Sequence, residues 1–192
     1  MAKSIKGTIT EQNLLKAFAG ECQAKNRYEF FAEQAKKEGY EQIAAIFEKT
    51  ALQEQSHAKQ FFKFMEGGAV EIKTVFTTGL ADRTIDNLKT TIDEENKEWS
   101  ALYPQFSETA KAEGFPAIAA IFKLIARVEA EHAKRFGKLL KRLEDGTVFR
   151  REQPIKWECR KCGYIHEGEQ PPQVCPACNH PIGYFEEMAD NL

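Results

Sequence analysis

The sequence has no long apolar run, no basic block and almost no net charge. Within its 192 residues no apolar stretch reaches about 18 residues, the length a transmembrane helix needs. Lys and Arg number 27 and Asp and Glu number 29, giving a formal net charge of −2. We therefore expect neither nucleic acid nor a membrane as a partner. The opening residues, MAKSIKGTITEQ, have no apolar core, so we expect no secretory signal.

Cysteine and proline are scarce in the first three quarters of the chain. Four of the five cysteines form two Cys-x-x-Cys pairs near the end, and five of the seven prolines follow residue 146. Without a secretion signal, metal ligation is a better interpretation of these cysteines than disulfides, and reduced thiols imply a cytoplasmic protein. The change in composition predicts two domains, residues 1–146 and 147–192.

Apolar residues of the first domain recur at helical spacing and predict four long helices. Glycines are expected to end three of them, and a proline suits the first turn of the last. A proline inside the third helix should kink it or remove one hydrogen bond. The expected signals are a Thr8–Glu11 capping box and Gly39 for the first helix, Gly67–Gly68 for the second, Pro104 and Gly114 for the third, and Pro116 for the fourth.

An internal repeat relates the two halves of this domain. Ile43–Phe47 recurs as Ile118–Phe122, and His57-Ala-Lys recurs as His132-Ala-Lys, each at an offset of 75 residues. The link Gly67–Gly79 can span roughly 43 Å when extended, about the length of a helix of 27 residues. The fold class we predict is therefore an all-α four-helix bundle with a long crossover, plus a small β/loop domain.

Seven acidic and histidine residues interrupt the apolar faces of the four helices. They lie three, four or seven residues from apolar neighbours, so they belong to the buried faces. Each repeat contains one Glu-x-x-His pair, whose two side chains point the same way. The glycine turns place all seven at nearly one level. They are Glu21 on the first helix, Glu54 and His57 on the second, Glu95 and Glu98 on the third, and Glu129 and His132 on the fourth.

These seven residues predict a site for two metal ions. A single Glu-x-x-His pair usually lies on a solvated face, but that interpretation does not explain seven residues on four inward faces. Five unpaired buried carboxylates would cost more than the ~5–15 kcal/mol by which a domain is stable. Five carboxylates carry a charge of −5, which two ferrous ions (+4) or two ferric ions (+6) nearly neutralise. Carboxylate oxygens together with imidazoles suit iron or manganese better than structural zinc.

Three further residues lie near this cluster in the predicted helices. Tyr28 and Tyr103 lie on the same faces and could donate hydrogen bonds to the ligating carboxylates. Equally, they could be core tyrosines with other partners. Cys22 follows Glu21, but successive helical residues point about 100° apart. We therefore interpret Cys22 as a small core residue and not as a ligand.

The C-terminal cysteines are spaced for one tetrahedral metal site. Two Cys-x-x-Cys loops separated by twelve residues supply four thiolates for zinc or a single iron ion, and geometry alone does not separate the two metals. So short a segment needs the metal to fold. The predicted ligands are Cys159, Cys162, Cys175 and Cys178, around an aromatic core of Trp157, Tyr164 and Phe185.

The chain resembles the rubrerythrin family over essentially its whole length. The motifs Phe18–Gln23, Glu54–His57, Glu95–Glu98 and Glu129–His132 and the two cysteine pairs follow in that family's order and spacing. The resemblance implies a ferritin-like bundle with a rubredoxin-like domain, two irons in the bundle and one iron on the cysteines. It implies that Glu54 and Glu129 bridge the irons, that Glu21, Glu95, Glu98 and His132 complete the ligands, and that His57 replaces Glu98 on reduction.

The resemblance also implies an activity, the reduction of hydrogen peroxide to water in oxidative-stress protection. The cysteine-bound iron would return electrons singly from an upstream rubredoxin or NAD(P)H-linked reductase, and the tail of one subunit would dock beside the bundle of another in a homodimer or larger homo-oligomer. One departure is Asn179, where free-standing rubredoxins usually have glycine. Two alternatives stay open, a ferroxidase or iron-storage protein and a zinc-stabilised binding module.

Overall fold

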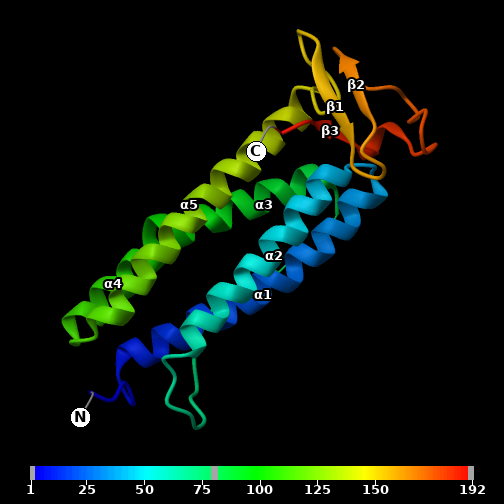
Figure 1. Ribbon diagram of the computed structural model, residues 1–192. Coiled ribbons are helices and arrows are strands. Elements are labelled where there is room, and N and C mark those ends of the chain that lie inside the picture. The colour runs from blue at the N-terminus through cyan, green and yellow to red at the C-terminus, as the bar shows by residue number, and fades with distance from the viewer. Residues whose placement is uncertain (1–2, 79–81, 190–192) are drawn as a thin grey trace.

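The computed structural model describes residues 3–78 and 82–189 and shows a long helical bundle with a small β domain at one end (Figure 1). Helices α1 and α2 form one antiparallel pair, and a second pair consists of α5 with the helical run of α3, η1 and α4. The bounds are α1 Ile9–Lys37, α2 Glu41–Phe62, α3 Thr84–Lys97, η1 Glu98–Leu102, α4 Tyr103–Ala112 and α5 Pro116–Glu144. The predicted four-helix bundle is confirmed.

Two apolar clusters fill the bundle, one toward each end. Phe47 and Phe136 lie in one cluster, with ring centroids 4.9 Å apart. Phe61 and Phe122 lie in the other, with centroids 5.0 Å apart. All four rings are 0% exposed. Because the acidic and histidine residues lie between these clusters in sequence, dry apolar packing closes the site from both ends.

The helix ends mostly follow the predicted signals. Thr8 caps α1, its Oγ1 accepting a hydrogen bond from the Glu11 N–H at 3.1 Å. Gly39 follows α1 at a φ of 80°, and Pro116 begins α5. The predicted end of the second helix was wrong, because α2 stops at Phe62, before Gly67.

A tertiary contact explains this early end of α2. The Glu66 carboxylate accepts hydrogen bonds from Ser4 Oγ at 2.5 Å and from the Ile5 N–H at 2.9 Å. Both donors precede α1, so Glu66 ties the chain after α2 to the N-terminal segment. That tie turns the chain away from the helix axis, and no local sequence signal reports it.

The chain between α2 and α3 crosses the length of the bundle, as predicted. Glu66 lies beside the N-terminal segment, while the Thr84 N–H donates to Glu38 at the opposite end of α1, 2.8 Å away. Between them, Gln23 Nε2 donates to the Thr77 carbonyl oxygen at 3.0 Å. We call residues 63–83 the crossover; residues 79–81 of it lie outside the described chain.

The third helix contains one turn of π-helix, η1, which ends at Leu102, two residues before Pro104. Glu21 and Tyr28 are seven residues apart in α1, whereas Glu95 and Tyr103 are eight apart across η1. The wider π turn accommodates this additional residue. Around this turn Leu102 is 37% exposed, whereas Tyr103 is fully buried.

The C-terminal domain is a three-stranded antiparallel sheet in the order β2-β1-β3, with one turn of 3₁₀-helix. The elements are β1 Ile155–Cys159, β2 Ile165–Gly168, η2 Ile182–Tyr184 and β3 Phe185–Glu187. Trp157 and Phe185 form its core, with Tyr164 packed against them as predicted. The division at residues 146 and 147 stays a prediction, which the end of α5 at Glu144 and the φ of 65° at Gly146 support.

This domain packs on the turn between α1 and α2 of its own chain (Figure 1). A Cβ added at Gly183 would overlap the carbonyl oxygen of Gly39. Phe149 stacks on Tyr40 with centroids 6.3 Å apart, and Glu187 accepts hydrogen bonds from Arg142 and Arg151 at 3.0 Å. The close approach of backbones at Gly183 and Gly39 therefore fixes where the tail sits.

Within the described residues, no helix combines the length and the apolar character that crossing a membrane requires.

Candidate metal centres

The structure brings six of the seven predicted residues of the bundle into two overlapping groups. In each group one ligand atom per residue lies within 4.8 Å of the others. Glu54 and Glu129 belong to both groups. The first group adds Glu21 and His57, and the second adds Glu95 and His132. Such a shared pair of carboxylates is the arrangement that holds two metal ions side by side.

The two histidines point the same ring nitrogen at the shared carboxylates. His57 Nδ1 lies 2.9 Å from Glu54 Oε2 and 3.0 Å from Glu129 Oε1. His132 Nδ1 lies 2.8 Å from Glu129 Oε2 and 3.1 Å from Glu54 Oε1. Each histidine therefore faces one oxygen of each shared glutamate, and the two halves of the site match.

Several buried atoms of this cluster lack a hydrogen-bond partner. They include Glu54 Oε1, Glu95 Oε2, both carboxylate oxygens of Glu129 and His132 Nδ1. Lone pairs left without donors are costly in a dry interior. Their convergence on common points fits two cations, and the donor set of carboxylates and imidazoles suits iron. The residues present therefore fit the metal pair that the sequence predicts.

The charges of the metal-free cluster are strongly coupled. Burial, reinforced by Glu54 and Glu129, raises the pKa of Glu95 to about 8. Burial also raises the pKa of Glu21 well above its usual range. Burial opposes ionisation of Glu54 too, but the imidazoles of His132 and His57 beside it lower its pKa to about 2. Without metal, the cluster therefore holds protons that a cation would displace.

The two predicted tyrosines bond to carboxylates across the bundle. Tyr28 on α1 donates its hydroxyl to Glu95 on α3 at 2.6 Å, and Tyr103 on α4 donates to Glu21 on α1. Both hydroxyls are buried, and burial raises both pKa values well above 10. The two tyrosines are 75 residues apart, so the repeat appears again as a reciprocal pair of hydrogen bonds.

Glu98 lies outside both groups. It begins η1, is half-buried, and also borders a surface cavity. Burial, followed by the charges of Glu21 and Glu95, raises the pKa of Glu98 well above 4.5. The structure thus places Glu98 beside the cluster without bringing its oxygens within the ligand distances of the other six residues.

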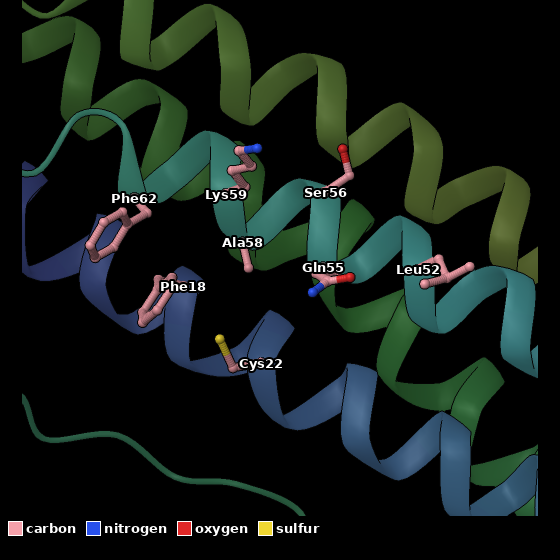
Figure 2. Close-up of a pocket in the computed structure, with 8 residues that line it drawn as sticks. All are labelled: Phe18, Cys22, Leu52, Gln55, Ser56, Ala58, Lys59 and Phe62. Atoms are coloured by element: carbon pink, nitrogen blue, oxygen red, sulfur yellow. The ribbon is translucent and has the colours of Figure 1, made fainter.

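The interpretation of Cys22 as a core residue was wrong. Cys22 is half-buried, and its thiol lines a groove on the outer side of the α1–α2 pair together with Phe18 and Phe62 (Figure 2). Cys22 belongs to none of the groups of potential metal ligands found among the described residues. The prediction that Cys22 is not a ligand is confirmed, because the 100° step from Glu21 turns its thiol away from the ligands.

The sequence interpretation missed Gln53 and Arg135. Gln53 Oε1 lies 3.1 Å from His132 Nε2 and accepts a hydrogen bond from Arg135 at 3.1 Å. Arg135 also donates to Thr50 Oγ1 at 2.8 Å. A donor proton on Nε2 leaves His132 Nδ1 free to face the cluster. The sequence did offer a signal for Gln53. The 75-residue offset of the repeat pairs Gln53 with Val128, whose side chain has no acceptor for the other histidine, so the two halves differ at this position.

The four C-terminal cysteines form a second, separate candidate centre. Their sulfur atoms lie within 4.8 Å of one another, with 3.8 Å between Cys159 and Cys178 and 3.7 Å between Cys162 and Cys175. The two knuckles match, since the N–H groups of Gly163 and Asn179 donate to the carbonyls of Cys159 and Cys175. Asn179 has a φ of 60°, a conformation that Asn tolerates better than most residues other than glycine.

Fold and sites together define a ferritin-like di-iron bundle joined to a rubredoxin-like four-cysteine domain. The rubrerythrin family model matches residues 12–140 and also 86–161, and the model "Rubrerythrin, rubredoxin-like domain" matches residues 157–186. The chain therefore belongs to the rubrerythrin family. Membership implies an oxidoreductase, with candidate sites for two irons in the bundle and a metal site on the cysteines.

Named relatives match over nearly their full length. Rubrerythrin of Porphyromonas gingivalis is 56% identical over 191 residues, covering 100% of this chain and 96% of the relative. Rubrerythrin of Nitratidesulfovibrio vulgaris is 49% identical, covering 98% and 99%. Fully reduced, all-ferrous nigerythrin superposes with a TM-score of 0.64 at 30% identity, covering 98% and 88%.

Proposed function

We propose that this protein is a non-haem di-iron peroxidase that reduces hydrogen peroxide to water. The observation that carries the proposal is the pair of ligand groups sharing Glu54 and Glu129 in the same chain as a four-cysteine centre. A storage protein needs no second metal centre in the same chain, so this combination favours electron transfer coupled to chemistry.

The proposed ligand roles follow the geometry. Glu54 and Glu129 would be shared by the two metal ions, because each faces both histidines. Glu21 and His57 serve one position and Glu95 and His132 the other. From the resemblance to the rubrerythrin family, and not from these distances, we assign Glu98 as a ligand that alternates with His57 when the oxidation state changes; Glu98 borders the cluster. When bound, the ferrous pair would supply two electrons for cleaving the O–O bond.

The chain's own residues orient the ligands and keep water out. Tyr28 and Tyr103 hold Glu95 and Glu21 by hydrogen bonds. The overall reaction takes one peroxide, two electrons and two protons to two waters. The four-cysteine centre would return the electrons one at a time, from an upstream rubredoxin or NAD(P)H-linked reductase. We place the protein in the cytoplasm, with no nucleic-acid or membrane partner.

The position of the tail bears on how electrons reach the bundle. The tail packs at Gly39, 18 residues along α1 from Glu21, which corresponds to roughly 27 Å of helix. Electron transfer slows steeply with distance. We therefore propose a homodimer or larger homo-oligomer in which the tail of one subunit serves the bundle of another.

Stopped-flow mixing of the fully reduced protein with hydrogen peroxide, and separately with dioxygen, tests the activity. We expect faster oxidation by peroxide, followed by oxidation of the four-cysteine iron. Glu98→Ala or His132→Ala should slow turnover and leave the visible spectrum of the tail unchanged. Full activity in both variants would show that the site is assigned wrongly.

Mixed oligomers test transfer between subunits. One subunit carries Glu129→Gln and the other carries Cys175→Ser, so neither homo-oligomer completes the cycle. Activity in the mixed protein would support transfer from the tail of one subunit to the bundle of the other. Mixed oligomers of confirmed composition that stay inactive would contradict it.

A further inference from the structure

The metal ligands of the bundle are closed to solvent on almost every side. Glu21, Glu54, Glu95, Glu129 and His132 are each no more than 2% exposed. His57 is 8% exposed, and Glu98 is half-buried. A reactant must therefore reach the metal pair through a particular opening, and Glu98 is half-buried and borders a surface cavity.

Glu98 forms part of the wall of a cavity of about 180 Å³. The cavity lies between α1, the η1–α4 run and the crossover. Gly20 contributes from α1, Leu102 from η1, Phe106 from α4 and Phe76 from the crossover. We call it the Glu98 cavity. It joins the surface to a residue that lies against the charge cluster.

We propose that the Glu98 cavity is the route by which small oxidants reach the metal pair, and that its size excludes bulky organic hydroperoxides. The identity of the oxidant as hydrogen peroxide rests on the proposed function. A water molecule takes about 30 Å³ in the liquid, so about 180 Å³ holds about six such molecules. A two-oxygen peroxide fits with its hydration water, whereas a benzene ring alone occupies a cavity of about 150 Å³, so an aromatic hydroperoxide leaves no room for water.

The wall of the cavity suits a small polar molecule. Lys16, Arg27 and Lys97 line it together with the apolar side chains already named. Arg27 forms an ion pair with Glu94 on the same wall. The cationic side chains also favour small anions, so azide is a suitable probe of this route.

The larger groove of Figure 2 is a poorer route. Its volume is about 600 Å³, and its lining residues come from α1 and α2. None of the eight residues that line it is one of the seven residues of the cluster. A molecule in this groove would meet Cys22 and Phe18 and would still be separated from the metals by the helices.

The crossover covers one side of the Glu98 cavity. Gln23 Nε2 donates to the Thr77 carbonyl oxygen, which fixes this part of the crossover to α1. Val75 is 93% exposed, whereas its neighbour Phe76 is 38% exposed. Phe76 thus narrows the cavity from the crossover side, and its removal should widen the opening.

Gly20→Leu tests the route by filling it. A Cβ at Gly20 meets no heavy atom within 4 Å, so the new side chain has the cavity as its available space. We expect azide to bind the metal-loaded variant about tenfold more slowly than the wild type. We expect the rate of its oxidation by hydrogen peroxide to fall by the same factor. Gly137→Leu is the matched control, because a Cβ there is equally open and lies on α5 away from the cavity.

Phe76→Ala tests the route in the opposite sense. It should speed oxidation by cumene hydroperoxide about tenfold relative to hydrogen peroxide. Wild-type azide kinetics in Gly20→Leu with full metal content would overturn the proposal, as would unchanged hydroperoxide selectivity in Phe76→Ala. If Gly20→Leu binds less metal than the wild type, its azide kinetics no longer test the route, and the hydroperoxide selectivity of Phe76→Ala then decides whether the proposal holds. Failure of the wild type to react with peroxide would refute the proposed function, while azide binding would still test the route.

Discussion

At the residue scale, the metal site of the bundle consists of buried carboxylates whose oxygen atoms converge. Glu54 and Glu129 are at most 2% exposed, yet three of their four oxygens have no hydrogen-bond partner. An uncompensated arrangement of this kind would cost several kcal/mol. Cations among the carboxylates remove the cost, and the residues around them then hold each ligand in place.

Gln53→Ala should weaken metal binding through His132. Gln53 accepts from His132 Nε2 and is itself held by Arg135. Loss of such an outer partner typically lowers metal affinity about ten- to hundredfold. Chelator competition with Co(II) measures it, and Gln55→Ala, which is exposed on the same helix, is the control. Equal affinities in both variants would show that Gln53 does not position His132.

Metal binding should become tighter as the pH rises. Burial raises the pKa of Glu95 to about 8, and carboxylate partners outweigh burial to raise that of His132 to about 11. Both groups hold protons in neutral solution without metal, and a metal ion must displace them. Apparent affinity should therefore rise about tenfold per pH unit for each proton released. Co(II) titrations between about pH 6 and pH 8 check this; constant affinity would contradict it.

At the element scale, the sequence predicts which helical faces are buried better than where elements end. The 3.6-residue period placed Glu21, Glu54 and Glu129 on the interior correctly because burial dictates that pattern. The end of α2 depends on Glu66 reaching the N-terminal segment, which is a tertiary contact. In the sequence, the π turn shows only as one additional residue between Glu95 and Tyr103, which are eight residues apart, whereas Glu21 and Tyr28 in the other repeat are seven apart.

The knuckle at Asn179 offers a direct test at this scale. Its φ of 60° disfavours side chains with a Cβ, except that Asn tolerates it better than most. Asn179→Ala should destabilise the tail by about 1–2 kcal/mol, and Asn179→Gly should not. The rate at which a chelator bleaches the tail iron reports the difference. Gly163→Ala, at a φ of 76° in the matching knuckle, should behave like Asn179→Ala.

At the scale of the whole molecule, the repeat builds the metal site and a backbone contact places the tail. The sequence showed two domains but gave no sign that Gly183 packs on Gly39, because a glycine contact leaves no periodic signal. Gln53 differs, because its contrast with Val128 in the repeat was visible in the sequence. Only its partners His132 and Arg135, about 80 residues away along the chain, were not.

Gly183→Ala should separate the tail from the turn between α1 and α2. The added Cβ would lie 3.0 Å from the Gly39 carbonyl carbon and closer still to its oxygen, and backbone atoms yield little. We expect faster hydrogen exchange at Tyr40 and Tyr184 and faster proteolysis between residues 145 and 154. Gly137→Ala, in open space, is the control. Unchanged exchange would mean that the contact does not hold the tail.

Anomalous diffraction at the iron edge, from crystals of the iron-loaded protein, tests the central claim most directly. We expect two peaks in the bundle, both in contact with Glu54 and Glu129, and a third among Cys159, Cys162, Cys175 and Cys178. A fully loaded protein with no peak beside the two shared glutamates would contradict it.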